Sequence, residues 1–289
     1  MSLAVVLTRG LEGLAAPLVR VEAHVGNGLP AFHVVGLAET EVKESRDRVR
    51  AALATSGFEF PQRRVTVSLA PADLPKESGR FDLPIALGLL AATGQVPATA
   101  LADTEFAGEL ALSGELRPIR GSLAMAAASR RGGRAFVLPE ASAREASLVP
   151  GAVLHPAKSL AAVCAHLAGR ERLDRVEPAP RAATREWPDL ADVRGQAMAR
   201  RALEIAAAGS HGVLFCGPPG TGKSMLAQRL PGILPAMTED ESLESAAVLS
   251  LGTAGFEPSR HRERPRRAPP HTPSPLPLAP PVLSPPSRA

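Results

Sequence analysis

The stretch GVLFCGPPGTGKS, at residues 212–224, decides how the rest of the sequence is interpreted. Its last eight residues match the pattern G-x-x-x-x-G-K-[ST], which is typical of a glycine-rich loop that joins a strand to a helix and binds phosphate. Residues 212–216 are apolar and are expected to form that strand, with a helix beginning behind Gly222. The sequence therefore predicts an α/β fold that carries a phosphate-binding loop.

The residue types of this loop suit a nucleoside triphosphate. Glycines allow the backbone to curl so that successive N–H groups point toward an anion, and the next helix adds its positive end. We expect the ammonium of Lys223 to reach the β- and γ-phosphates and the hydroxyl of Ser224 to bind Mg²⁺. The expected cofactors are therefore ATP and Mg²⁺. The expected cofactor-binding residues of the loop are Gly217, Pro218, Pro219, Gly220, Thr221, Gly222, Lys223 and Ser224.

Residues 1–170 alternate strand-like and helix-like segments, which predicts a mixed α/β domain. Apolar and polar residues alternate over 64–70, as in a half-buried strand, while Val42, Val49 and Leu53 share one side of a helix expected over 39–56. Further strands are expected at 3–8, 18–25, 31–35, 105–112, 115–119, 135–138 and 152–155, and further helices at 82–93, 121–131, 142–148 and 157–168.

The composition divides the rest of the chain into three parts. Residues 171–188 are polar, contain Pro and Arg and show no apolar periodicity, which is typical of a linker. Residues 189–257 are expected to form a second unit, with a helix over 195–208 and the start of another at 239–241. Residues 258–289 contain eleven prolines in 32 residues, and we expect them to be a disordered tail.

Length and charge limit the classes of protein that fit. The chain has 289 residues, of which 45% are hydrophobic and 21% charged, and this balance predicts a soluble globular protein of about two domains. The formal net charge is +4. The tail after residue 257 has six arginines against one acid, Glu263, so the remaining chain sums to −1. A near-neutral body gives little support for a nucleic-acid-binding face.

The sequence also bears on cellular location. It contains no run of 18 apolar residues, and its N-terminus lacks the pattern of a signal peptide. We therefore expect a cytoplasmic protein with no membrane partner. The two cysteines, Cys164 and Cys216, are too few and too far apart for a disulfide framework or a zinc pair. Both are expected to be buried thiols.

Several segments resemble a known family. Residues 189–196, DLADVRGQ, resemble the first segment of AAA+ ATPase domains, in which the Val-x-Gly-Gln portion lies against the adenine. This resemblance adds Val193 and Gly195 to the expected nucleotide-binding residues. The first domain resembles that of the magnesium-chelatase-like AAA+ ATPases of the YifB/ComM type. The motifs that carry the resemblance are NGLPAF (27–32), VGL (35–37), ESRDRVRAA (44–52), GFEFPQRR (57–64), LAPADLPK (69–76), FDLPIAL (81–87) and GELALSGELRPI (108–119).

The resemblance implies a first domain folded like the proteolytic domain of Lon, which raises the question of peptidase activity. A Ser/Lys dyad needs a hydroxyl and an amine within hydrogen-bond reach. The segment 75–82 continues into Phe-Asp-Leu-Pro where the Lon serine would follow, and 118–124 contains no lysine. We interpret Lys76 and Ser78 as a surface turn. No catalytic residue is expected in this domain, and the chain is not expected to be a peptidase.

Hydrolysis of ATP needs a carboxylate pair at the end of a second strand, where it orients Mg²⁺ and the attacking water. No apolar run followed by Asp-Glu occurs after Lys223. The sensor residues, arginine finger and helical lid of the family have no counterpart either. Residues 265–272 resemble a distorted copy of a family motif, after which Pro, Ser, Leu, Arg and Ala dominate. We therefore expect a frameshifted or prematurely ended member in which hydrolysis is deficient.

Three hypotheses of function remain open. The first is an ATP-driven motor that acts on DNA, as the resemblance implies, with a homohexamer expected for full-length relatives but not for this chain. The second is a non-catalytic nucleotide-binding or scaffold fragment. The third is nucleic-acid binding by the arginines of residues 260–267. Measurements of ATP binding and of phosphate release distinguish the first two.

Overall fold

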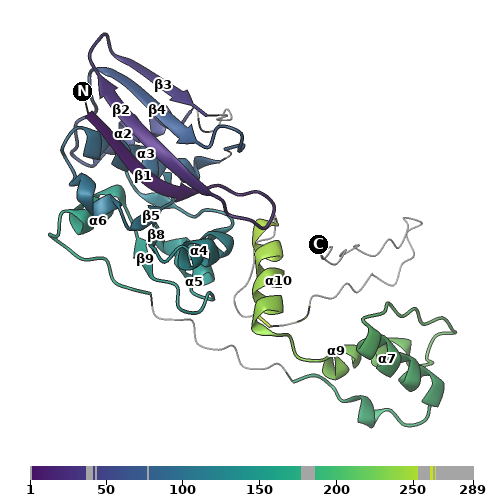
Figure 1. The fold of residues 1–289 in the computed structure, drawn as a ribbon. Coiled ribbons are helices and arrows are strands. Elements are labelled where there is room, and N and C mark those ends of the chain that lie inside the picture. The colour runs from purple at the N-terminus through teal and green to yellow at the C-terminus, as the bar shows by residue number, and fades with distance from the viewer. Residues whose placement is uncertain are drawn as a thin grey trace. The chain divides into compact units, whose positions relative to one another are not determined.

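The structure is a computed structural model that describes residues 2–36, 42, 44–76, 78–176, 186–252, 261–262 and 264. The chain divides into two compact units (Figure 1). The first comprises Met1–Ala182 and Leu243–His261, and the second comprises Ala183–Ser242 and Arg262–Ala289. Among the described residues, no helix is long and apolar enough to cross a membrane.

The first unit is built on a mixed sheet of seven strands within the described residues. The order is β3-β4-β2-β1-β5-β8-β9, in which β2 runs antiparallel to β1 and β4, and the other neighbours are parallel. This confirms the predicted mixed α/β fold. The strands are β1 (Ser2–Arg9), β2 (Leu18–Gly26), β3 (Ala31–Val35), β4 (Arg64–Ala70), β5 (Thr104–Phe106), β8 (Ala135–Pro139) and β9 (Leu154–Ala157).

Alternation of side chains explains these strands. In β4, Val65, Val67 and Leu69 are fully buried while the residues between them are partly exposed, as the period of two predicts. In β8, the side chain of Val137 packs into one core and those of Phe136 and Leu138 into a second. The sheet therefore has an apolar core on each face at β8.

Helices pack on the two faces of the sheet at different strands. The helix α3 is buried almost all round and packs on β1 and β2, where a side chain at Gly88 would collide with Ala23. Figure 1 shows α4 and α5 beside β8 and β9. The helices are α2 (Ser45–Thr55), α3 (Asp82–Ala92), α4 (Ser122–Arg131), α5 (Glu140–Ala146) and α6 (Leu160–Leu167). Residues 37–41 and 43, at the start of the helix predicted over 39–56, lie outside the described residues.

The single strand predicted over 105–112 is wrong. The chain leaves the large sheet after Phe106 and forms β6 (Glu109–Leu110), which pairs with β7 (Leu116–Arg117) in a separate two-stranded sheet. Between β5 and β6, the backbone N–H of Gly108 donates to Arg80 O and its carbonyl accepts from Leu83 N, both at 3.0 Å. These bonds to the start of α3 replace the ladder bonds that a continuous strand needs.

The helix α10 (Glu239–Leu251) begins in the second unit, and its C-terminal half belongs to the first. Its N-terminus lies at the three acidic residues that predicted it. Ala246 and Ala247 are buried in the same apolar core as residues of α4, α5 and β8. Ser250 Oγ donates to Glu145 of α5. Residues 243–251 therefore pack as part of the first unit.

Part of the predicted linker also packs on the first unit. Leu173 and Val176 contact the two cores, and Val176 N donates to Leu154 O at 3.0 Å. Residues 171–176 thus have no helix or strand, as expected, but they do contribute apolar burial. Residues 177–185 of the linker lie outside the described residues, as does the predicted tail apart from three positions, 261, 262 and 264.

The second unit is small and helical in its described part. A compact apolar cluster of Leu190, Val193, Leu203 and Leu226 is its core. The predicted helix over 195–208 is confirmed as α7. The strand predicted at 212–216 is wrong, because no strand is present among the described residues of this unit to provide ladder partners. The elements are a 3₁₀ turn (Leu190–Asp192), α7 (Ala197–Gly209), α8 (Lys223–Ala227) and α9 (Leu230–Ile233).

Candidate phosphate-binding site

The glycine-rich loop, residues 217–222, connects the extended residues 212–216 to α8. Its three glycines have positive φ angles: 155° at Gly217, 83° at Gly220 and 82° at Gly222. Residues with a Cβ rarely adopt such angles, so the glycines at these positions shape the loop. A Cβ added at Gly220 would meet no atom within 4 Å. The backbone there is open to an approaching group.

Lys223 lies across this loop. Its Nζ donates to Gly217 O at 2.8 Å and to Pro218 O at 2.7 Å, and it lies 3.4 Å from Thr221 Oγ1. Thr221 Oγ1 in turn donates to Pro218 O at 2.9 Å. The ammonium is thus held over the loop by backbone carbonyls that carry no net charge. A phosphate oxygen would be a stronger acceptor for the same donors.

Sequence reasoning did not single out Gln196, which contacts this loop. Its Nε2 donates to Thr221 O at 2.8 Å, across 25 positions of sequence. Gln196 stands at the N-cap of α7 with φ 49° and ψ 41°, a left-handed conformation that follows another at Gly195, φ 71°. The pair of residues turns the chain so that the Gln196 side chain reaches the loop. The Val-x-Gly-Gln motif, which ends at Gln196, could have identified this residue as part of the site.

A second link joins the upstream segment, residues 189–196, to α8. Arg229 follows α8, and its side chain is 15% exposed. Its Nε donates to Asp189 O at 2.9 Å and its Nη1 to Met225 O at 3.0 Å, while Nη2 lies 3.8 Å from Asp192 Oδ2. Arg229 was not predicted either, because no local pattern relates it to residues 40 positions away.

The structure brings most of the predicted site residues together. Residues 217–222 form one loop, and Lys223 and Ser224 lie in the first turn of α8. Gly195 is at the turn next to Gln196, whereas the Val193 side chain is 2% exposed and packs in the core with Leu226. The Val193 side chain therefore anchors the segment in the core of the second unit.

The donors of this site fit a triphosphate with Mg²⁺. Gly222 N–H has no acceptor among the described residues, and the Lys223 ammonium is bonded only to neutral oxygens. Phosphate oxygens would satisfy both groups. The Ser224 hydroxyl suits Mg²⁺, which takes oxygen ligands and is usually shared with phosphates. Within the described residues, no three His, Cys, Asp or Glu side chains gather as a separate metal site.

The two cysteines differ from expectation. Cys164 is buried in the core of the first unit, and burial raises the pKa of its thiol to about 12. Cys216 is exposed, so the prediction that it is buried is wrong. The cause is the missing strand: without ladder partners, residues 212–216 do not form the centre of a sheet.

Lys76 and Ser78 do not form a surface turn, so that interpretation is wrong for the lysine. Lys76 is fully buried, its Nζ donates to Pro71 O, and burial lowers its pKa. The Ser78 hydroxyl accepts a hydrogen bond from Arg80 Nε at 2.8 Å. The amine and the hydroxyl are thus bonded to different groups.

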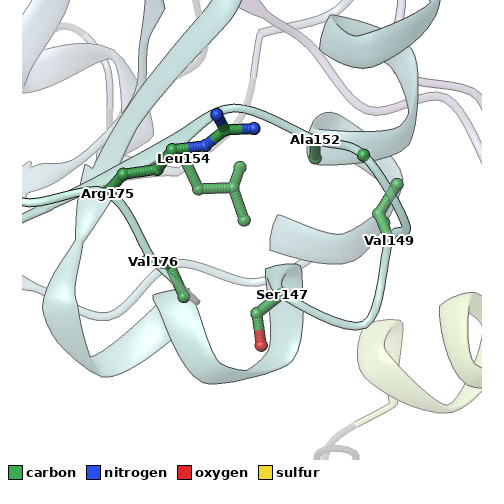
Figure 2. Close-up of a pocket in the computed structure, with 7 residues that line it drawn as sticks. Ser147, Val149, Ala152, Leu154, Arg175 and Val176 are labelled. Carbon is green, nitrogen blue, oxygen red and sulfur yellow. The ribbon is translucent and has the colours of Figure 1, made fainter. Parts of the chain in front are cut away.

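A small hollow of about 200 Å³ lies in the described part of the first unit. Figure 2 shows the side chains that surround it, with the Arg175 guanidinium beside Leu154 and with Val176 across from Val149. The hollow is formed where residues 171–176 cross β9. Pockets for drug-sized ligands begin at about 300 Å³, so this hollow is too small for a nucleotide.

Two arginines of the predicted basic tail have acidic partners. Arg262 Nη2 lies 3.1 Å from Glu239 Oε1, and Arg264 Nη2 lies 3.2 Å from Glu241 Oε2. Both acids are in the first turn of α10. These contacts reduce the positive charge that residues 260–267 could offer to nucleic acid.

Two family models match the chain. One, described as subunit ChlI of Mg-chelatase, covers residues 21–142, and the other, magnesium chelatase subunit ChlI, covers residues 189–280. The chain therefore belongs to the magnesium-chelatase ChlI family, as the resemblance predicted.

Individual relatives agree with this assignment. The chain is 49% identical over 274 residues to protein YifB of Salmonella typhimurium. The matched region is 95% of this chain and 54% of the relative. It is 47% identical over 274 residues to YifB of Escherichia coli, with the same shares. It is 48% identical over 279 residues to competence protein ComM of Haemophilus influenzae, covering 95% and 55%. The chain spans about half the length of these curated relatives.

Proposed function

We propose that the second unit binds ATP with Mg²⁺ through residues 217–224. The observation that carries this proposal is the Lys223 ammonium, held over a loop of left-handed glycines in which the N–H of Gly222 has no acceptor among the described residues. A cation and an open backbone donor on one loop are what a polyphosphate needs. The motif and the family assignment support the same conclusion.

Each residue has a distinct role in this proposal. Lys223 exchanges the carbonyls of Gly217 and Pro218 for the β- and γ-phosphates, and the backbone around Gly220 and Gly222 donates to them. Ser224 holds Mg²⁺, which supplies neutralisation of the phosphate charge. Gly195 and the core-anchored Val193 place the upstream segment against the adenine, as the family resemblance implies.

The test uses the full chain and a fluorescent ATP analogue. Lys223→Ala is expected to weaken binding by at least about tenfold, because a charge-assisted hydrogen bond contributes about 1.5–3 kcal/mol. Lys158→Ala is the matched control, since Lys158 is an exposed lysine of the first unit, 3.7 Å from Glu140. Failure of the unaltered chain to bind, or equal binding by both variants, contradicts the proposal.

Turnover is a separate question. We propose that this chain binds ATP but releases phosphate slowly, because its residues after Lys223 contain no apolar strand followed by paired carboxylates. Phosphate release measured with Mg²⁺ and ATP tests this point. Release that depends on Lys223 would indicate an active motor, whereas binding without release would indicate a nucleotide-binding or scaffold module.

The larger activity concerns the full-length protein. One relative is named a competence protein, and we propose that a full-length relative of this chain acts on DNA as an ATP-driven, hexameric motor. In this proposal the first unit is a Lon-like module without peptidase activity. Unwinding or strand exchange by a full-length relative, compared with its variant at the position of Lys223, tests the motor. ATP-independent activity would contradict it.

A further inference from the structure

The hydrogen bond between Gln196 and Thr221 controls one specific peptide of the phosphate loop. Gln196 Nε2 donates to Thr221 O at 2.8 Å. In a trans peptide the C=O and the following N–H point in opposite directions. A bond that holds Thr221 O toward Gln196 therefore turns the N–H of Gly222 away from Gln196.

Gly222 is the position where this orientation matters. Its φ is 82°, and its N–H has no acceptor among the described residues. A glycine with no Cβ can rotate its peptide at little steric cost, so the sequence alone does not fix the direction of this N–H. The next residue is Lys223, the first residue of α8. An external restraint on the Thr221–Gly222 peptide thus sets the direction of a backbone donor one residue before Lys223.

We propose that Gln196 is a positioning residue that orients the Gly222 N–H toward a bound polyphosphate. This inference rests on the proposed function and deepens it, because it names a residue outside the motif that organises the phosphate cradle. The group recognised is the phosphate chain, with or without an attached base. Gln196 acts through the Thr221 carbonyl and does not touch the ligand.

The location of Gln196 links the two ends of the site. It belongs to the upstream segment, whose backbone is anchored by the buried Val193 and by the hydrogen bond from Arg229 to Asp189 O. It also adopts φ 49° without being glycine, a conformation that persists when surrounding contacts determine it. The segment expected to meet the base therefore also restrains the loop expected to meet the phosphates.

The experiment compares Gln196→Met with Gln228→Met in the full chain. Methionine has a similar length to glutamine but no N–H donor. Gln228 is an exposed glutamine just after α8, and its side chain makes no hydrogen bond within the described part of the chain. Affinities for inorganic tripolyphosphate and for ATP are measured by competition with a fluorescent ATP analogue. Amide shifts of Gly222 and Ser224 on addition of tripolyphosphate are measured by nitrogen-15 NMR.

We expect Gln196→Met to lower the affinities for tripolyphosphate and for ATP by the same factor. That factor is about fivefold, the contribution of one hydrogen bond. The shift of the Gly222 amide should fall while that of Ser224 persists, and Gln228→Met should match the unaltered chain. Unchanged tripolyphosphate affinity, or a loss confined to ATP, overturns the inference. Equal loss of both amide shifts also overturns it, because this would indicate general damage to the unit. If the unaltered chain binds neither ligand, the proposed function fails, and this inference fails with it.

Discussion

Arg48 and Asp82 form a bidentate ion pair between α2 and α3, in which Nε lies 2.7 Å from Oδ2 and Nη2 lies 3.0 Å from Oδ1. The Asp82 side chain has no exposed surface, and its Oδ2 also accepts from Leu110 N at 3.2 Å. Burial raises the pKa of Asp82 to about 6, against the opposing effect of Arg48 and Leu110 N. The hydrogen bond to Asp82 raises the pKa of Arg48. The carboxylate is therefore well bonded and still costly to ionise.

This pair predicts a pH dependence of stability. The pKa of Asp82 in the folded protein, about 6, lies above its usual value of 3.8, so between these pH values the folded state binds more protons than the unfolded state. The contribution of Asp82 to stability therefore rises as pH falls from 7 to 5, by about 1 kcal/mol. Urea unfolding at both pH values should show this gain in the unaltered chain relative to Asp82→Asn. An equal pH response of the two proteins would contradict the assignment.

The burial of α10 in the first unit predicts a large effect of a charge on its inner face. Ala246 is 2% exposed and packs in the core shared with α4 and α5, whereas Val248 on the same helix is 49% exposed. Ala246→Glu should lower the free energy of unfolding by about 3 kcal/mol, because it buries an unpaired charge. Val248→Glu, the control, should change it by less than about 0.5 kcal/mol. Similar losses in the two variants would show that α10 does not pack as described.

The sequence predicts the elements of the first unit because their patterns are local. The alternation at Val65, Val67 and Leu69 needs only neighbouring residues, and the structure confirms that strand. The strand predicted over 105–112 fails at Gly108, whose backbone bonds to the start of α3. That partner lies more than 20 positions away, and periodicity carries no information about it.

The candidate site follows the same rule. The loop from Gly217 to Ser224 could be found from its motif, because the glycines and the lysine lie at fixed spacings within eight residues. The contact of Gln196 with Thr221 and that of Arg229 with Asp189 join residues 25 and 40 positions apart. Gln196 is part of the Val-x-Gly-Gln motif, but that motif does not indicate its partner in the loop, and the contact of Arg229 has no signature in composition or spacing. The exposure of Cys216 was missed for a related reason: an apolar run predicts a strand but does not supply the strands that would pair with it.

The two thiols should differ in reactivity. Cys216 is exposed, whereas Cys164 is buried and has a pKa raised to about 12 by burial. Since the thiolate is the reactive form, a disulfide reagent such as Ellman's should label Cys216 rapidly in the folded chain and Cys164 only on unfolding. Cys216→Ser should abolish the rapid phase. Rapid labelling of both thiols in the folded state would contradict the burial of Cys164.

Replacement of Arg229 should lower the affinity for ATP more than the affinity for free tripolyphosphate. Its guanidinium ties the upstream segment to α8 through Asp189 O and Met225 O, and within the described residues it makes no hydrogen bond or ion pair with residues 217–222. Arg229→Met should lower the affinity for ATP by about tenfold, the contribution of a charge-assisted hydrogen bond. Tripolyphosphate affinity should change by less than about twofold. The reason is that Arg229 holds the upstream segment, residues 189–196, which we expect to lie against the adenine. Gln196 instead holds the glycine-rich loop.

The control for this prediction is Arg201→Met. Arg201 is an exposed arginine of α7 that pairs with Glu204 on the same helix at 3.0 Å, and its loss should leave both affinities unchanged. Equal weakening of ATP and tripolyphosphate by Arg229→Met would show that Arg229 supports the whole unit. In that case the division between a base side held by Arg229 and a phosphate side held by Gln196 would be wrong, even if the chain binds ATP.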